Sequence, residues 1–212
     1  VTRPPDVGGL GFNLKWNMGW MNDMCHYLKL DPWFRQDHHR DLTFSMMYAF
    51  SENYVLPISH DEVVHMKGSF FGKMPGDNPM KFAGVRVFYT YMLAHPGKKL
   101  TFMGAELAQW NEWHYEYSLD WHLLQYEPHR QTQEFFKAAN AFYLEHPELW
   151  DMDFDWEGFE WIEADDHHCL LPPLGQGGQP PAGSVQLLSG TPEGLSGGDP
   201  LRRDVVRCAE HR

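Results

Sequence analysis

A short segment of the chain gathers four ionisable side chains that could act on a substrate: Ser59-His60-Asp61-Glu62-Val63-Val64-His65. It directly follows the apolar run 54–59, which has the composition of a buried strand. Carboxylates at the carboxyl ends of parallel strands are often catalytic, because substrate sites form there. A solvated loop acid or a helix cap is the alternative interpretation. Asp61 and its neighbour His60 are therefore candidate functional residues.

Metal binding is not indicated by the histidines. A zinc-binding helix needs two histidines four residues apart, whereas His60 and His65 are five apart and would point roughly 140° from each other on a helix. The run Asp166-His167-His168-Cys169 spells the short signature of membrane palmitoyltransferases, but the sequence has no transmembrane run and no cysteine-rich module. We interpret the pair His38-His39 as a loop or helix-start feature. No metal site and no cofactor are predicted.

Composition limits the classes of partner. The formal net charge of −12 argues against nucleic-acid binding, and no basic run suggests an anionic membrane surface. Apolar runs such as 85–94 fall short of the roughly 20 residues that span a membrane, and no signal-peptide pattern opens the chain, so we expect a cytoplasmic location. Cys25, Cys169 and Cys208 are widely spaced and are expected to be free thiols. Because the first residue is Val, we expect the natural chain to begin earlier.

The elements that must position these residues repeat one theme three times, a short apolar strand followed by a polar loop and an amphipathic helix. The expected strands are 10–16, 54–59 and 100–103, and the expected helical stretches are 42–50, one that opens at Asn78-Pro79 and stops at His95-Pro96-Gly97, and one that ends at His146-Pro147. Apolar side chains recur three or four apart in the last two helices: Phe82, Val85, Tyr89 and Met92, then Phe135, Phe136, Ala139, Phe142 and Tyr143.

This alternation predicts the α/β class with a parallel sheet, either doubly wound or closed into a barrel. The pattern alone does not separate the two. The loops that follow the strands are much longer than the turns that follow the helices, and this asymmetry favours a barrel with its site at the carboxyl ends of the strands.

Further blocks of the chain carry a more specific pattern: Gly8-Gly9-Leu10-Gly11-Phe12, Lys15-Trp16-Asn17-Met18-Gly19-Trp20-Met21, Asp31-Pro32, Met74-Pro75-Gly76-Asp77, Pro96-Gly97-Lys98-Lys99-Leu100, Phe102-Met103-Gly104 and Ser118-Leu119-Asp120-Trp121-His122-Leu123-Leu124. Together with Val55 to His65, in this order and spacing, they resemble bacterial glycogen (1,4-α-glucan) branching enzymes. The resemblance covers nearly all of residues 1–166. It implies a partial (β/α)8 TIM barrel of the α-amylase superfamily, contributing strand-helix units six to eight.

The resemblance also implies a reaction and roles. In that superfamily an Asp nucleophile, a Glu acid/base and a second Asp act together, and only the second Asp maps onto this chain, as Asp61. It would stabilise the transition state, and His60 would contact substrate hydroxyls. The implied reaction is retaining: an α-1,4-glucan is cleaved and its chain is transferred to a 6-hydroxyl, which forms an α-1,6 branch. The nucleophile and the acid/base are expected to be absent from this chain.

Three segments are expected on this basis. Residues 1–150 would be the C-terminal part of the catalytic barrel and residues 151–166 the start of a C-terminal β-sandwich, while residues 167–212, rich in Gly, Pro and Ser, would be a disordered tail. A reading-frame shift would explain the tail, and a genuine divergent tail is the alternative. Three strands cannot close a barrel, so Phe12, Leu56 and Phe102 would lack burying partners. We expect the isolated chain to be inactive and poorly folded or aggregation-prone.

Aromatic residues after the third strand are weaker candidates. Trp110, Trp113 and Trp121 could stack on glucose rings or serve packing equally well. Glu106 could support the site through hydrogen bonds, whereas Asp120 is expected to order its loop. Lys98 and Lys99 are interpreted as a solvated turn.

Three functions follow from the sequence. The first is transglycosylation within a larger branching enzyme acting on α-1,4-glucan or glycogen, completed by the missing N-terminal part of the same enzyme. The second is a hydrolase of the same superfamily, and the third is a non-catalytic glucan-binding fragment. The Ser59 to His65 segment favours the first, because it resembles branching enzymes more than amylases.

Overall fold

The chain folds into a parallel sheet covered by helices, with a second, antiparallel sheet near its end. The computed structural model describes residues 1–161, 163–164, 168–171 and 185–188. Its strands are β1 (Lys15–Trp16), β2 (Tyr54–Ile58), β3 (Lys98–Thr101), β4 (Glu163–Ala164), β5 (His168–Leu171) and β6 (Val185–Leu188). Its α-helices are α1 (Met18–Lys29), α2 (Arg40–Thr43), α3 (Asn78–Ala94) and α4 (Glu127–Glu145).

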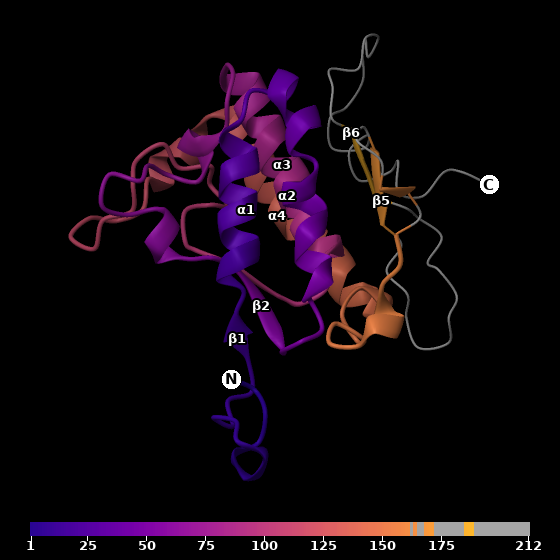
Figure 1. Ribbon diagram of the computed structural model, residues 1–212. Helices are drawn as coiled ribbons and strands as arrows, with labels where there is room; N and C mark the ends of the chain where they lie inside the picture. The colour runs from indigo at the N-terminus through magenta and orange to yellow at the C-terminus, as the bar shows by residue number, and fades with distance from the viewer. Residues whose placement is uncertain (162, 165–167, 172–184, 189–212) are drawn as a thin grey trace.

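The first sheet has the order β1-β2-β3 and all of its strands are parallel. Val55 lies at its centre, paired with Trp16 on one side and Lys98 on the other. The connections between the strands carry the helices, which gather on one side of the labelled strands β1 and β2 (Figure 1). The α/β class and the parallel sheet expected from the sequence are therefore confirmed.

Side chains of β2 alternate between the helix layer and the opposite face of the sheet. Leu56 and Ile58 belong to the apolar core with the helices, and Leu56 is fully buried. The expectation that Leu56 lacks burying partners is therefore wrong, because its place in the alternation turns it toward the helices. Trp16 pairs with Val55 and shares the opposite face, where it is 41% exposed.

The helix that follows the first strand is α1, which sequence analysis missed. Asn17 caps it by accepting a hydrogen bond from the backbone N–H of Trp20 at 3.0 Å. Its buried residues recur at helical spacing: Trp20, Met21, Met24, Tyr27 and Leu28. The expected helical stretch 42–50 is only partly helical, with α2 and the short 3₁₀ helix Phe44–Met47. The expected strand 10–16 is also shorter, since only Lys15 and Trp16 pair with β2.

Helix α3 matches its expected limits, and α4 ends where it was expected to end. Helix α3 begins at Asn78, but its cap is Asp77, which accepts a hydrogen bond from the backbone N–H of Met80 at 3.1 Å. Helix α4 ends at Glu145, directly before His146-Pro147. The two helices pack through Tyr89 and Phe136, whose rings stack with centroids 4.1 Å apart.

Strand β3 begins two residues earlier than expected and includes both lysines assigned to a solvated turn. The side chain of Lys99 is only 9% exposed, and its ammonium donates hydrogen bonds to the carbonyl oxygens of His95 and Gly97. Asp153 contacts both lysines, with its carboxylate oxygens 2.9 Å from Lys98 Nζ and 3.8 Å from Lys99 Nζ. The solvated-turn interpretation is therefore wrong, because Asp153, far away in sequence, supplies the countercharge.

The second sheet has the order β4-β5-β6 and is antiparallel. Strand β4 lies in the segment expected to open a β-domain. Strands β5 and β6 lie within 167–212, where no regular structure was expected, and both are rich in apolar residues, Cys169-Leu170-Leu171 in β5 and Val185, Leu187 and Leu188 in β6. The remaining residues of the expected tail lie outside the described residues. Within the described part, none of the helices has the length and apolar character needed to cross a membrane.

Candidate functional site

The candidate site begins where β2 ends, because a short 3₁₀ helix (His60–Glu62) follows the strand directly. Ser59 caps this helix: its hydroxyl oxygen accepts a hydrogen bond from the backbone N–H of Asp61 at 3.2 Å. The buried carboxylate of Glu62 returns to Ser59 and accepts hydrogen bonds from its backbone N–H and its hydroxyl. This reciprocal capping box fixes the direction in which the chain leaves the sheet.

The capping box leaves two adjacent acids in different environments. Glu62 is buried and its carboxylate accepts hydrogen bonds from Ser59, whereas the side chain of Asp61 is 53% exposed. His60 lies beside it, with Nε2 3.3 Å from Asp61 Oδ1. The structure thus presents one carboxylate and one imidazole together at the carboxyl end of β2, as the sequence predicted. Such a pair can bind hydroxyl groups and stabilise positive charge.

Two lysines fasten the loop that follows Asp61. The ammonium of Lys67 donates to the carbonyl oxygen of Asp61 at 2.7 Å, and that of Lys73 donates to the carbonyl oxygen of Lys67 at 2.6 Å. Burial lowers the pKa of Lys73. His65 and Met66 both have positive φ angles, 54° and 66°, a backbone conformation that residues other than glycine rarely adopt. The loop is therefore a strained segment tied to the backbone of Asp61.

The end of β3 brings a second group of residues beside the first. The ring of Phe102 lies 6.0 Å from the ring of His60 and 5.1 Å from that of Trp113, measured between centroids. The backbone N–H of Trp113 donates to the carbonyl oxygen of Val63 at 3.0 Å, which joins the two loops. A shallow pocket lies between the strand ends and is lined by Ile58, Val63, Ser69, Phe70, Phe102, Met103, Gly104, Ala105, Gln109, Asn111 and Trp113.

The other expected site residues are placed differently. Glu106 accepts a hydrogen bond from the backbone N–H of Gly104 at 2.9 Å, so its carboxylate shapes its own turn. Trp110 packs edge-on against Phe71, with centroids 4.9 Å apart, and keeps 46% of its surface exposed. The structure therefore brings Trp113 into the group around His60, while Glu106 bonds within its own turn and Trp110 contacts the neighbouring loop through Phe71.

Trp121 and Asp120, two further residues singled out by the sequence, lie in the loop between β3 and α4, called the β3 loop below. Trp121 begins a short 3₁₀ helix and is 52% exposed. The carboxylate of Asp120 accepts a hydrogen bond from the side-chain amide of Asn111 at 2.8 Å, and its backbone N–H donates to the side chain of Gln109. These contacts agree with the expectation that Asp120 orders its loop.

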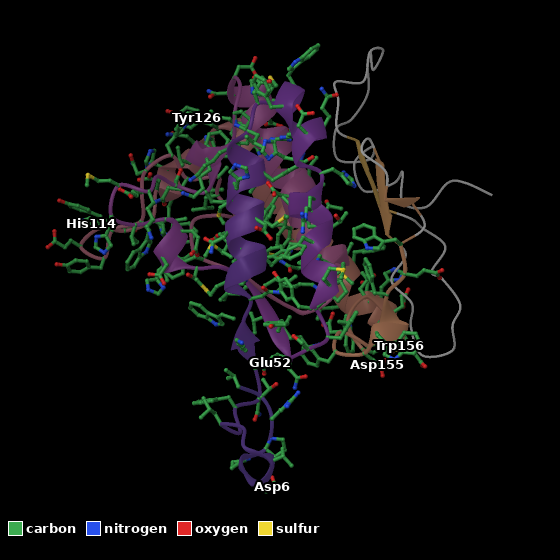
Figure 2. The ribbon with its side chains drawn as sticks, viewed as in Figure 1. Asp6, Glu52, His114, Tyr126, Asp155 and Trp156 are labelled. Carbon is green, nitrogen blue, oxygen red and sulfur yellow. The ribbon has the colours of Figure 1, made fainter. Side chains whose placement is uncertain are left out.

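The same loop carries an exposed aromatic cluster that was not predicted from the sequence. His114 stacks on Tyr115, with centroids 5.3 Å apart and planes at 12°, and its ring lies 5.1 Å from that of Tyr117. Tyr115 and Tyr117 are about three-quarters exposed. Figure 2 shows His114 at the outer edge of the molecule, away from the helices. The dense run Trp113-His114-Tyr115-Glu116-Tyr117 is the sequence signal that could have identified it.

No protein-family model matches the chain, but comparison with known proteins finds similar sequences. The 1,4-alpha-glucan branching enzyme GlgB of Thermosynechococcus vestitus is 58% identical over 172 residues, 81% of this chain and 22% of that protein. The enzyme of the same name from Aquifex aeolicus is 58% identical over 166 residues, 78% of this chain and 26% of that protein. That from Synechococcus sp. (strain JA-3-3Ab) is 53% identical over 192 residues, 91% of this chain and 25% of that protein.

A solved structure shares the fold. A pullulanase type I from Bacillus subtilis str. 168, complexed with maltose, matches 80% of this chain and 27% of that chain with a TM-score of 0.59 and 14% identity. The chain spans about a quarter of the length of its sequence relatives. At 53–58% identity over most of its residues, the resemblance is confirmed: this chain is a homologue of a segment of the bacterial 1,4-alpha-glucan branching enzymes.

Proposed function

We propose that this chain acts as part of a glycogen branching enzyme, which cleaves an α-1,4-glucan and transfers the freed chain to a 6-hydroxyl. The identity to branching enzymes across most of the chain supports this proposal. The α-1,4-glucan or glycogen is then the substrate, the net charge of −12 disfavours nucleic acid as a partner, and the cytoplasm is the expected location.

In this proposal, β1, β2 and β3 are the sixth, seventh and eighth strands of a (β/α)8 barrel. Their parallel order, the helices between them and the fold shared with the pullulanase support the assignment. The other five strands, the nucleophilic Asp and the acid/base Glu come from a part of the enzyme outside this chain. Strand β4 would then lie at the start of the C-terminal β-sandwich.

Asp61 is the proposed transition-state stabiliser, and the observation that carries this role is its position. It is the exposed acid at the carboxyl end of β2, with His60 at 3.3 Å, while the adjacent Glu62 is held in the cap. Glycosyl transfer passes through an oxocarbenium-like state in which the sugar ring gains positive charge. A carboxylate that holds the ring hydroxyls stabilises that state more than the ground state.

His60 and Trp113 are the proposed substrate contacts around Asp61. The imidazole of His60 can donate a hydrogen bond to a sugar hydroxyl. Trp113 offers an aromatic face beside the pocket, and Trp110, which precedes it in the same loop, adds an exposed face, while Glu106 lies nearer the end of β3. Aromatic rings pack against the apolar faces of sugars, so these positions fit a glucan chain that crosses the strand ends.

The test uses a chimera in which residues 1–161 of this chain replace the matching segment of the Thermosynechococcus vestitus enzyme. Amylose is incubated with the chimera, and new α-1,6 branches are measured by the loss of iodine staining and by chain-length analysis after debranching. We expect the chimera to form branches and the 212-residue chain alone to form none. Asp61→Asn should lower kcat by roughly a hundredfold or more with a smaller change in KM.

Asp151→Asn is the matched control, because Asp151 is an exposed acid after α4. It should leave branching unchanged. A chimera that releases short free sugars in place of branches would assign this segment to a hydrolase. Glucan binding without turnover by the chimera would favour a non-catalytic glucan-binding role.

A further inference from the structure

Two histidines and a carboxylate converge on the helix layer, outside the site described above. His26 lies in the last turn of α1, His38 at the end of the 3₁₀ helix Pro32–His38, and Asp41 in α2. Asp41 Oδ2 lies 2.7 Å from His26 Nδ1 and 3.9 Å from His38 Nδ1. All three ligand atoms lie within 4.8 Å of one another. Three segments therefore present their polar atoms to one point.

We propose that His26, His38 and Asp41 form a binding site for a divalent transition-metal ion, with Zn²⁺ the best match. Imidazole nitrogen and carboxylate oxygen are the ligands that this ion takes together in proteins. Bonds of about 2.0–2.2 Å in a tetrahedral site hold ligand atoms about 3.3–3.5 Å apart. The two measured separations, 2.7 and 3.9 Å, lie on either side of that range.

The side chains can adjust to these distances. Those of His26 and His38 are 55% and 39% exposed, so they can rotate and an ion can reach them, while Asp41 is 21% exposed and provides a fixed anchor. The imidazole rings meet edge to face with centroids 5.0 Å apart. Small rotations of exposed rings bring both Nδ1 atoms to an ion in front of Asp41 Oδ2.

The charge around the cluster favours a cation. Asp23 lies three residues before His26 on the same face of α1. Burial raises the pKa of Asp23, and the negative charge of Asp41 raises it further. A cation bound between two neighbouring carboxylates offsets the repulsion between their negative charges. Asp23 or a water molecule would complete four ligands.

Metal binding here would join α1 to α2 across the segment 30–39. The His146 and Glu148 pair shows why the second histidine matters. Its Nδ1 to oxygen distance is also 2.7 Å, yet it is not part of the one group of three potential ligands found among the described residues. His146 therefore supplies a matched control, a half-buried histidine paired with one carboxylate.

The test is a Zn²⁺ titration of the 212-residue chain at low micromolar concentration against a chromophoric chelator, at neutral pH. We expect one Zn²⁺ per chain. His26→Gln, His38→Gln and Asp41→Asn should each weaken binding by at least roughly tenfold, and His146→Gln should not change it. Far-UV circular dichroism checks that each variant keeps its helices, and repeating the four variants in the chimera covers any variant that unfolds in the isolated chain.

Cobalt distinguishes this site from the cysteines. Co²⁺ bound by nitrogen and oxygen in a tetrahedral site gives visible d–d bands without the near-ultraviolet thiolate band. That spectrum, lost in His26→Gln, supports the site. Three results would each overturn the site. The first is a Zn²⁺ affinity that is the same in the three variants as in the unsubstituted chain, and the second is an intense thiolate band that persists in the variants. The third is the absence of saturable binding in both the 212-residue chain and the chimera.

Discussion

The carboxylate of Glu62 accepts two hydrogen bonds from Ser59, one from its backbone N–H at 2.6 Å and one from its hydroxyl at 2.8 Å. The next acid back along the chain, Asp61, has an exposed side chain beside His60. The capping box thus determines which of two neighbouring carboxylates faces solvent. It makes Glu62 a positioning residue and leaves Asp61 free to contact a substrate.

The first prediction separates these two roles. Ser59→Ala in the chimera removes a hydroxyl that both accepts from Asp61 and donates to Glu62, so the unfolding free energy should fall by about 1–2 kcal/mol. Turnover should fall as well, because Asp61 is held less firmly. Ser59→Thr, which keeps the hydroxyl, should restore both. Urea denaturation and the branching assay measure the two effects; an unchanged free energy with Ser59→Ala would contradict the role of the cap.

The second prediction concerns the buried charge of Lys99. Asp153→Ala removes its countercharge and that of Lys98, and it also removes the acceptor for the backbone N–H of Gly97. Breaking a buried ion pair on one side costs about 3–5 kcal/mol, so urea denaturation of the chimera should show a loss of that size. Asp151→Ala nearby is exposed and should change the unfolding free energy by less than about 0.5 kcal/mol. Equal effects of the two variants would contradict the prediction.

The third prediction is a loss of stability in mild acid. His95 is fully buried, with Nδ1 2.9 Å from the carbonyl oxygen of Pro96 and Nε2 2.8 Å from Ser45 Oγ. Since a carbonyl only accepts, Nδ1 carries the proton and the Ser45 hydroxyl donates to Nε2. Burial lowers the pKa of His95 to about 3.

The sign follows from the unfolded state, in which this imidazole has a pKa near 6.5 and binds a proton that the folded state rejects. The contribution of neutral His95 to stability is therefore present above about pH 6.5 and declines as the pH falls toward 3, by at most roughly 1.4 kcal/mol per pH unit. Urea denaturation of the chimera between pH 7.5 and 5 should show this decline. His95→Gln should flatten it, whereas substitution of the half-buried His146 by Gln should not. An unaltered slope in His95→Gln would refute the assignment.

The fourth prediction tests glucan contact at the β3 loop. Trp113→Ala in the chimera should raise KM for amylose several-fold, because the ring that lines the pocket is lost. Trp156→Ala is the control: Trp156 is 70% exposed and lies with Asp155 after α4, away from His114 in Figure 2. An equal rise in KM for both variants would point to a general effect of lost tryptophan surface.

The fifth prediction is that the isolated chain self-associates. Phe12, Leu14 and Trp16 precede or form β1 and are 61%, 43% and 41% exposed. Exposed apolar side chains at the edge of a sheet favour association, so light scattering should report large species for the 212-residue chain and a smaller one for the chimera. Trp16→Lys should reduce association. A monodisperse chain with a cooperative thermal transition would contradict this prediction.

Local signals were sufficient for part of the fold. The apolar run 54–59 gave β2, the Asn78-Pro79 pair opened α3, and His146-Pro147 ended α4. Each of these limits depends on residues close in sequence. The position of Asp61 after β2 followed in the same way, because a strand end is a local feature.

Other parts depended on distant residues and could not be read locally. Lys99 looks like a turn residue until Asp153 is placed beside it. Leu56 was expected to lack burying partners, since alternation gives two faces but only packing decides which one the helices cover. His26 and His38 met only after three segments had folded together. The cap formed by Glu62 differs from these cases, because the spacing Ser59-x-x-Glu62 is a local capping-box signature that could have identified it from the sequence.

The connection from α3 to β3 is only His95 to Gly97, while the connections that leave β2 and β3 are long. Gly97 has a φ of 114°, and a Cβ there would meet the carbonyl oxygen of Tyr54 at 3.1 Å. This turn therefore admits neither an insertion nor a larger side chain at Gly97, whereas the long loops at the other end of the sheet can lengthen or change composition without disturbing the core. Evolution and protein engineering can accordingly alter the loops at that end of the sheet, and whatever they contact, while the scaffold stays the same.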